Sequence, residues 1–114
     1  ALQLSEEGLY LTVMNFPWLN TVDADWLVST VAPYATVMTL DNHYTMFGQG
    51  SMIAHALSQL PGEKKQVISL GLDTIPTCGQ NPDVLHAHGL DASSLATRFR
   101  EAVSKQQVNI PATV

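Results

Sequence analysis

Basic residues and cysteine are both scarce in this chain of 114 residues. Five Lys and Arg stand against ten Asp and Glu, and the basic residues form no stripe that alternates with aromatics. This balance, a net charge of −5, argues against nucleic acid as a partner. The single cysteine, Cys78, excludes an internal disulfide framework and is typical of a reducing compartment. We therefore expect a cytoplasmic protein.

Long hydrophobic runs are absent as well. Stretches such as Leu9–Met14 and Val67–Leu72 are far shorter than a bilayer span, and no basic-then-apolar leader precedes them, so no membrane association is expected. Only 13% of the residues are charged while 46% are apolar, which predicts a globular fold with part of its exterior covered by another domain or subunit. The length favours a single domain over residues 1–114, with a loose tail over 106–114.

Strand-like and helix-like segments alternate along the chain. Strand formers predict three strands, and apolar spacing with capping residues predicts a helix end over Ala1–Gly8 and four further helices. The predicted strands are Leu9–Asn15, Ala35–Leu40 and Gln66–Leu70; the further helices follow Asp23, begin at Ser51, cover Asp83–His88, and follow Asp91. Asp41–Gly50 is predicted to be a loop. This alternation indicates an α/β fold with a mainly parallel sheet, because parallel neighbours need crossover connections.

Four segments in this order resemble the C-terminal domain of the transketolase family, which includes deoxyxylulose-phosphate synthase and the β subunits of 2-oxo-acid dehydrogenases. Leu4–Asn15 (LSEEGLYLTVMN) is similar to the family's "L-x-E-x-G" helix end and its following strand. Thr39–Gly50 (TLDNHYTMFGQG) resembles "V-E-E-H-x-x-x-G-G-L-G", with Asp41 and Asn42 in place of the acidic pair. Ser51–Leu57 continues that match, and Leu85–Val103 contains "L-x-x-x-G-L-D" before an amphipathic helix.

This resemblance implies a three-layer α/β/α domain whose first two strands are missing from the chain, with a gap between the strands at Leu9 and Ala35. We therefore expect a trimmed or fragmentary chain. In the family, catalytic and cofactor-binding residues lie mainly in the two preceding domains, so no catalytic, cofactor-binding or metal-binding role is carried over to any residue here. The resemblance implies thiamine diphosphate and a divalent ion such as Mg²⁺ in the parent enzyme, a homodimer, and packing against the parent's other domains.

One stretch contains residues with functional potential. The Gly48-Gln49-Gly50 turn opens a helix and could present N–H groups to an anion, or it could simply be a tight turn. His43, near Asp41, could act as a general base or be a polar loop residue. The aromatic cluster Tyr44–Phe47 is predicted to be an interface loop. Together these give a possible anion or interface loop made of Asp41, His43, Tyr44, Phe47, Gly48 and Gly50.

Other side chains with reactive groups are not expected to form a functional site. His86 and His88 are two residues apart, which points them to different faces of a helix, and Cys78 has no evident activating base in the sequence. The leading hypothesis is a non-catalytic accessory domain of a transketolase-like enzyme, inactive as an isolated fragment. The alternatives are a regulatory or partner-binding module that uses Gly48–Gly50 and Tyr44–Phe47, and a small enzyme that uses His43 and Asp41.

Overall fold

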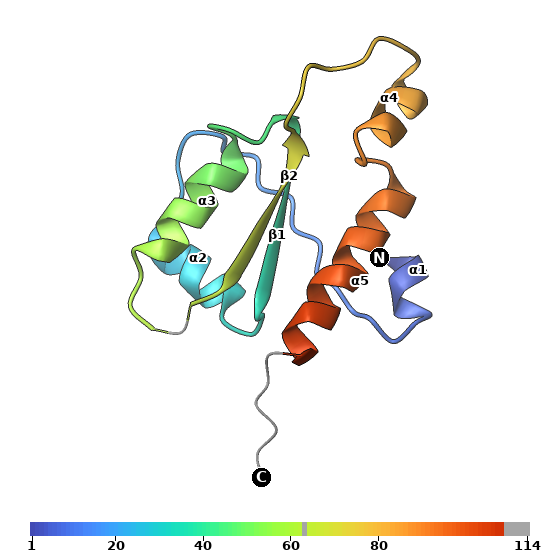
Figure 1. The fold of residues 1–114 in the computed structure, drawn as a ribbon. Helices are drawn as coiled ribbons and strands as arrows, with labels where there is room; N and C mark the ends of the chain where they lie inside the picture. Colours follow the sequence, from blue (N-terminus) through green and yellow to red (C-terminus); the bar gives the residue numbers. More distant parts are fainter. Residues whose placement is uncertain (63, 109–114) are drawn as a thin grey trace. The chain divides into compact units, whose positions relative to one another are not determined.

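The protein is described by a computed structural model that covers residues 1–62 and 64–108 (Figure 1). Five helices and two strands follow one another along these residues. They are α1 (Leu2–Ser5), α2 (Ala24–Val31), β1 (Thr36–Tyr44), α3 (Gln49–Ser58), β2 (Gln66–Leu72), α4 (Asn81–Ala87) and α5 (Ala92–Val108). In the described part of the chain, no helix is long and apolar enough to cross a membrane.

The chain divides into two compact units. Unit 1 consists of Ala1–Asn15 and Gly79–Val114, and unit 2 consists of Phe16–Cys78. The interpretation of residues 1–114 as a single domain stays a prediction. Helix α5 continues to Val108, past the predicted start of the tail at 106, and the rest of that tail lies outside the described residues.

Unit 2 contains the sheet. β1 and β2 run parallel, with Thr36 opposite Gln66 and Leu40 opposite Leu70, and α3 connects them. α2 and α3 pack on one another beside the two strands (Figure 1), around a core of Leu27, Val31 and Ile53. Parallel strands joined by a helix confirm the predicted α/β class.

The prediction of a strand at Leu9–Asn15 is wrong. Among the described residues only β1 and β2 form a sheet, and Leu9–Asn15 belongs to neither a strand nor a helix. Strand propensity reflects packing on a pleated neighbouring surface, and the side chains of Tyr10 and Val13 are exposed. Without a strand at Leu9–Asn15, the gap predicted between the strands at Leu9 and Ala35 does not occur among the described residues.

The loop predicted over Asp41–Gly50 is shorter in the structure. β1 continues to Tyr44, which pairs with Leu72 after a register shift, and Thr45 N–H donates to the Leu72 carbonyl at 2.9 Å. Helix α3 begins at Gln49, two residues before the predicted start. Asp and Asn are poor strand formers, so the local propensity of Asp41 and Asn42 hid a strand end that pairing with β2 stabilises.

Local capping signals were more reliable. The Asp23 carboxylate accepts the Trp26 N–H at 2.9 Å at the start of α2, which confirms the predicted cap. In unit 1, Gly89 adopts φ 64° just after α4, and α5 begins after Asp91. A bidentate pair between Glu7 and Arg100 ties the segment after α1 to α5.

Candidate functional site

Asp41, a residue of β1, caps the start of α3 with its carboxylate. Its Oδ1 accepts the Gln49 N–H at 3.1 Å and its Oδ2 accepts the Gly50 N–H at 3.0 Å, and the residue is only 5% exposed. These N–H groups belong to the first turn of the helix, where no backbone carbonyl can accept from them. The carboxylate also lies at the positive end of the helix dipole. An external anion at these N–H groups would therefore have to displace a buried carboxylate.

Glycines allow this close approach. A Cβ on Gly48 would lie 2.7 Å from Asp41 Oδ2, and a Cβ on Gly50 would lie 2.3 Å from Thr39 Oγ1. On the neighbouring strand, a Cβ on Gly71 would lie 2.8 Å from the His43 carbonyl oxygen. The glycines of the motif therefore let the start of α3 sit against the ends of β1 and β2.

His43 lies beside Asp41, but its ring is hydrogen-bonded to a backbone carbonyl and not to the Asp41 carboxylate. Its Nδ1 lies 2.9 Å from the Tyr44 carbonyl oxygen, and because a carbonyl can only accept, Nδ1 carries the proton in this arrangement. Its Nε2 lies 3.8 Å from Asp41 Oδ1, too far for a hydrogen bond. The half-exposed imidazole is thus held at the rim, and the carboxylate that could orient it as a base is already bound to the helix.

Gln49 is a structural residue of this site that the sequence analysis missed. Its Nε2 donates to the Phe16 carbonyl at 2.8 Å and to the Trp18 carbonyl at 3.0 Å. This amide fixes the Phe16–Trp18 segment to the start of α3 from more than thirty positions away in sequence. A glutamine between two glycines gives no sequence signal for such a contact.

Phe47 is the most unusual residue of the loop. Its φ is 62°, and within residues 1–62 and 64–108 it is the one residue other than glycine with a positive φ. The left-handed conformation places Cβ too close to the following carbonyl in an L-residue. Its side chain is nevertheless 93% exposed, so little in the described structure packs against the ring.

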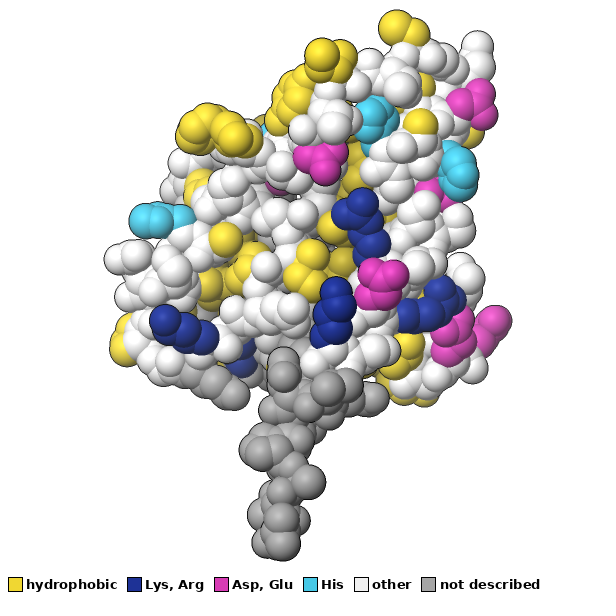
Figure 2. Space-filling model, in the orientation of Figure 1, with side chains coloured by type: hydrophobic (Ala, Val, Ile, Leu, Met, Phe, Trp, Pro, Cys, Tyr) yellow, Lys and Arg dark blue, Asp and Glu magenta, His cyan; other side chains and the backbone are white. Residues whose placement is uncertain are grey.

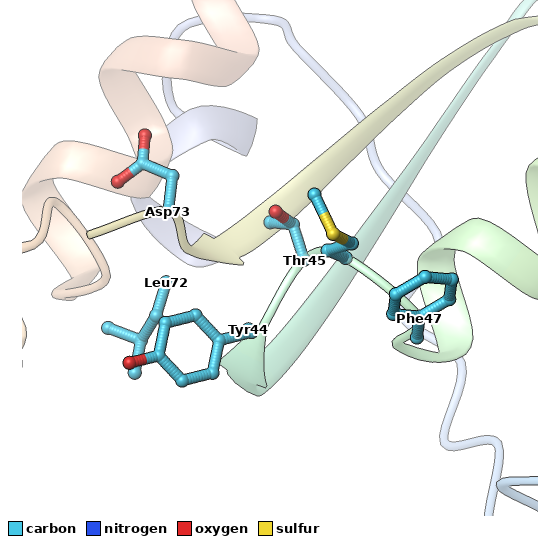
Figure 3. Close-up of a pocket in the computed structure, with 6 residues that line it drawn as sticks. Tyr44, Thr45, Phe47, Leu72 and Asp73 are labelled. Atoms are coloured by element: carbon cyan, nitrogen blue, oxygen red, sulfur yellow. The ribbon is translucent and has the colours of Figure 1, made fainter. Parts of the chain in front are cut away.

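A hollow of about 440 Å³ lies beside Phe47. Figure 3 shows the residues that line this hollow. Tyr44 and Leu72 lie together on one side of it and Phe47 lies on the other. Its lining residues are Tyr44, Thr45, Met46, Phe47, Leu72 and Asp73. Hydrophobic side chains are exposed where β2 ends and α3 begins (Figure 2). The structure thus brings the predicted loop residues to the carboxyl end of the two strands.

The remaining reactive side chains do not form a reactive cluster. His86 Nδ1 lies 3.5 Å from Asp91 Oδ2, and Cys78 is exposed. A hydrogen bond from the Ser93 hydroxyl, followed by one from Ser94, lowers the pKa of Asp91 well below its usual range. The Asp91 carbonyl accepts the Leu95 N–H at 3.0 Å at the start of α5, while its carboxylate bonds the Ser93 hydroxyl, so the predicted capping by the side chain stays a prediction.

Two features of the described residues bear on the thiamine diphosphate and divalent ion that the resemblance implies for the parent enzyme. No group of three or more His, Cys, Asp or Glu side chains lies together there in a way that could hold a metal. The start of α3, which could otherwise bind a phosphate, is closed by Asp41.

The fold and the loop define a class: a parallel α/β domain whose helix start is closed by its own aspartate and whose rim is apolar. Residues 1–95 match the family described as "Transketolase, C-terminal domain". The chain therefore belongs to the transketolase family, to the part formed by its C-terminal domain.

Named relatives agree with this assignment. The 1-deoxy-D-xylulose-5-phosphate synthase of Polaromonas sp. (strain JS666 / ATCC BAA-500) is 32% identical over 98% of this chain and 18% of its own length. The synthase of Albidiferax ferrireducens is 34% identical over 83% of this chain and 15% of its own. The chain thus spans less than a fifth of these relatives. No solved structure matches it closely enough to be compared.

The backbone conformation of Phe47 is unusual for its residue type. A glycine adopts positive φ without strain. This chain therefore has a large aromatic side chain on a backbone conformation that suits glycine.

Proposed function

We propose that this chain is a non-catalytic accessory domain of a transketolase-like, thiamine-diphosphate-dependent enzyme, where it supports domain packing and dimer assembly. The observation that supports this most directly is the use made of Asp41. Its carboxylate is buried and accepts hydrogen bonds from two backbone N–H groups, so the one acidic side chain of the motif stabilises the fold. The exposed part of the same loop is apolar, which suits contact with another protein surface better than proton transfer.

The parent enzyme would transfer two-carbon units or condense a 2-oxo acid with an aldehyde. Its relatives are named 1-deoxy-D-xylulose-5-phosphate synthase, and we extend that activity to the parent enzyme as part of this proposal. Thiamine diphosphate and Mg²⁺ would be bound by the parent's other domains, which would also be partners of this chain. A cytoplasmic location, suggested by the single cysteine, also stays a prediction.

The test is complementation in trans. The Polaromonas sp. synthase is shortened by the region that matches this chain, and the 114-residue chain is added as a separate polypeptide. We expect the chain to join the shortened enzyme and to restore turnover and dimer mass, while the chain alone turns nothing over. His43→Ala serves as the control and is expected to leave the restoration intact, because His43 is assigned no catalytic role.

Two outcomes would contradict the proposal. The first is a chain that never joins the shortened enzyme, although both are folded by circular dichroism. The second is turnover by the chain alone that disappears in His43→Ala, which would favour the small-enzyme hypothesis.

The second candidate is a regulatory or partner-binding module. The exposed loop Tyr44–Phe47 favours its protein-binding form, whereas the engagement of Asp41 at the start of α3 argues against its anion-binding form. Thermal unfolding with inorganic pyrophosphate and Mg²⁺ separates the two. We expect no change in Tm, and a rise of several degrees that grows with pyrophosphate would support the anion-binding form.

A further inference from the structure

Two exposed aromatic side chains border the hollow at the end of β1. Phe47 is held outward by a left-handed backbone, and little in the described structure packs against its ring. Strained residues of this kind are concentrated at functional sites. Tyr44 is exposed as well, and the two residues lie on opposite sides of the hollow (Figure 3). Because the faces of aromatic rings attract cations, this border suits a positively charged group.

A carboxylate also lines the hollow. Asp73 directly follows β2 and is exposed. Within the described part of the chain, this residue takes part in no ion pair. Its charge is therefore available to a group from outside.

The two lysines of unit 2 are too distant to pair with this carboxylate. Lys64 and Lys65 precede β2 whereas Asp73 follows it, and a strand of seven residues separates them by about 20 Å. Salt at physiological concentration screens most of the attraction over such a distance. The Lys65 ammonium also donates to the Ala32 carbonyl at 3.0 Å. The hollow thus combines a negative charge with aromatic side chains and has no cation from its own unit.

The Asp73 carboxylate decides which kind of side chain suits the hollow. An apolar occupant would remove water from this carboxylate without giving it a partner, which is unfavourable for a charged group. A cationic occupant pairs with the carboxylate and contacts the aromatic rings. Arginine makes both contacts better than lysine, because its planar guanidinium stacks on rings and can donate two parallel hydrogen bonds to a carboxylate.

We propose that the hollow bordered by Tyr44, Phe47 and Asp73 binds an arginine side chain from a surface of the parent enzyme. The aromatic rings contact the plane of the guanidinium, and the Asp73 carboxylate accepts its N–H groups. The source of the arginine rests on the proposed function, in which this chain packs against the parent's other domains. The binding chemistry itself can be measured on the chain alone.

The first experiment is an NMR titration of the isotope-labelled 114-residue chain with N-acetyl-argininamide, at an ionic strength held constant with NaCl. The matched ligand is N-acetyl-citrullinamide, which has nearly the same shape but no charge. We expect saturable shifts of the amide signals of residues 44–47 and 72–73, with a dissociation constant of about 5–50 mM. The citrulline probe should bind about 3–10-fold more weakly. A second series at higher salt should weaken only the arginine probe.

Variants of the chain assign the contacts. Asp73→Asn keeps the size of the side chain and removes its charge, so it should weaken arginine binding about 2–5-fold and leave citrulline binding unchanged. Phe47→Leu keeps an apolar side chain without a ring and should also weaken arginine binding about 2–5-fold. The control is Asp25→Asn, which neutralises an exposed carboxylate in the first turn of α2 that does not line the hollow. This variant should bind arginine like the original chain.

The second experiment tests the source of the arginine. In the complementation assay, the Asp73→Asn chain should be needed at about 2–5-fold higher concentration to restore the shortened synthase, whereas Asp25→Asn should act like the original chain.

Three results would overturn the inference. They are equal binding of the arginine and citrulline probes, an Asp25→Asn variant as impaired as Asp73→Asn, and an Asp73→Asn chain that binds the arginine probe weakly but joins the shortened synthase normally. In the third case the arginine would not belong to the enzyme. A chain that binds the arginine probe but never joins the enzyme would contradict the proposed function, while the arginine-binding chemistry of the hollow would stand.

Discussion

Helix α3 in unit 2 and helix α5 in unit 1 each begin beside an aspartate. The two aspartates differ in how many residues separate them from the helix along the chain. Asp91 directly precedes α5, is partly exposed and is bonded by the nearby Ser93 hydroxyl. Asp41 comes from β1, eight residues before the helix, and is almost completely buried. A neighbouring cap stabilises one helix end. A cap from a strand also fixes where the helix lies on the sheet.

The largest effect should appear when the Asp41 carboxylate is removed, and the local cap of α2, Asp23, provides the comparison. Asp41→Ala leaves the N–H groups of Gln49 and Gly50 without their acceptor in a buried place, which we expect to cost about 2–4 kcal/mol of unfolding free energy. Asp23→Ala, which removes a local cap, should cost about 1 kcal/mol. Urea denaturation of both variants measures the difference, and equal losses would break the comparison.

The packing at the start of α3 gives the next largest effect. Gly50→Ala puts a Cβ within 2.3 Å of Thr39 Oγ1, a buried hydroxyl with no hydrogen-bond partner in the described structure. We expect a loss of about 1–3 kcal/mol.

Two further variants check this explanation. Gly79→Ala, whose Cβ would meet Val84 at an ordinary 3.5 Å, should cost far less. Thr39→Ala should recover part of the loss when combined with Gly50→Ala, and strictly additive losses in that pair would show that the assigned clash is wrong.

A smaller effect of opposite sign is expected at Phe47. Phe47→Gly removes the strain of a positive φ in an exposed residue and should raise the unfolding free energy by about 1 kcal/mol, reduced by the entropy that glycine adds to the unfolded chain. The measurement is thermal unfolding of the variant and the original chain under the same conditions. Phe47→Ala, which keeps a Cβ, serves as the control and should gain little. A destabilised Phe47→Gly would show that the ring has structural contacts.

The smallest effect is a pH dependence at the start of α5. The hydrogen bond from the Ser93 hydroxyl is the largest cause of the lowered pKa of Asp91. The carboxylate therefore stays ionised to lower pH in the folded state than in the unfolded chain. Its contribution to stability is therefore fully present above pH about 4, the ordinary range of an aspartate, and is lost as the pH falls through the lowered folded pKa.

Ser93→Ala should flatten this part of the stability curve below pH 4. The hydrogen bond from Arg100 also lowers the pKa of Glu7, so Glu7 contributes to the acid response in the same direction, and the comparison of Ser93→Ala with the original chain isolates Asp91. An unchanged curve would mean that Asp91 has no part in the acid response.

Much of the local structure followed from the sequence, and the exceptions share one cause. The Asp23 cap, the apolar spacing of α3 and the glycine after α4 act over a few residues, so the sequence could reveal them. Leu9–Asn15 has strand-forming residues but belongs to no strand, whereas Asp41 and Asn42 are poor strand formers but lie within β1. Both errors arose because a strand depends on its neighbours more than on its own residues.

The candidate site divides in the same way. The sequence by itself determined the family, the alternation of strands and helices, and the position of the glycine-bearing loop, because these depend on residue types and their spacing. Only the tertiary structure decided that Asp41 closes the helix start, that Gln49 ties down a distant segment, and that Phe47 stands outward beside a hollow. The physical reason is that hydrogen bonds, burial and backbone strain depend on groups brought together by folding, which residue order does not specify.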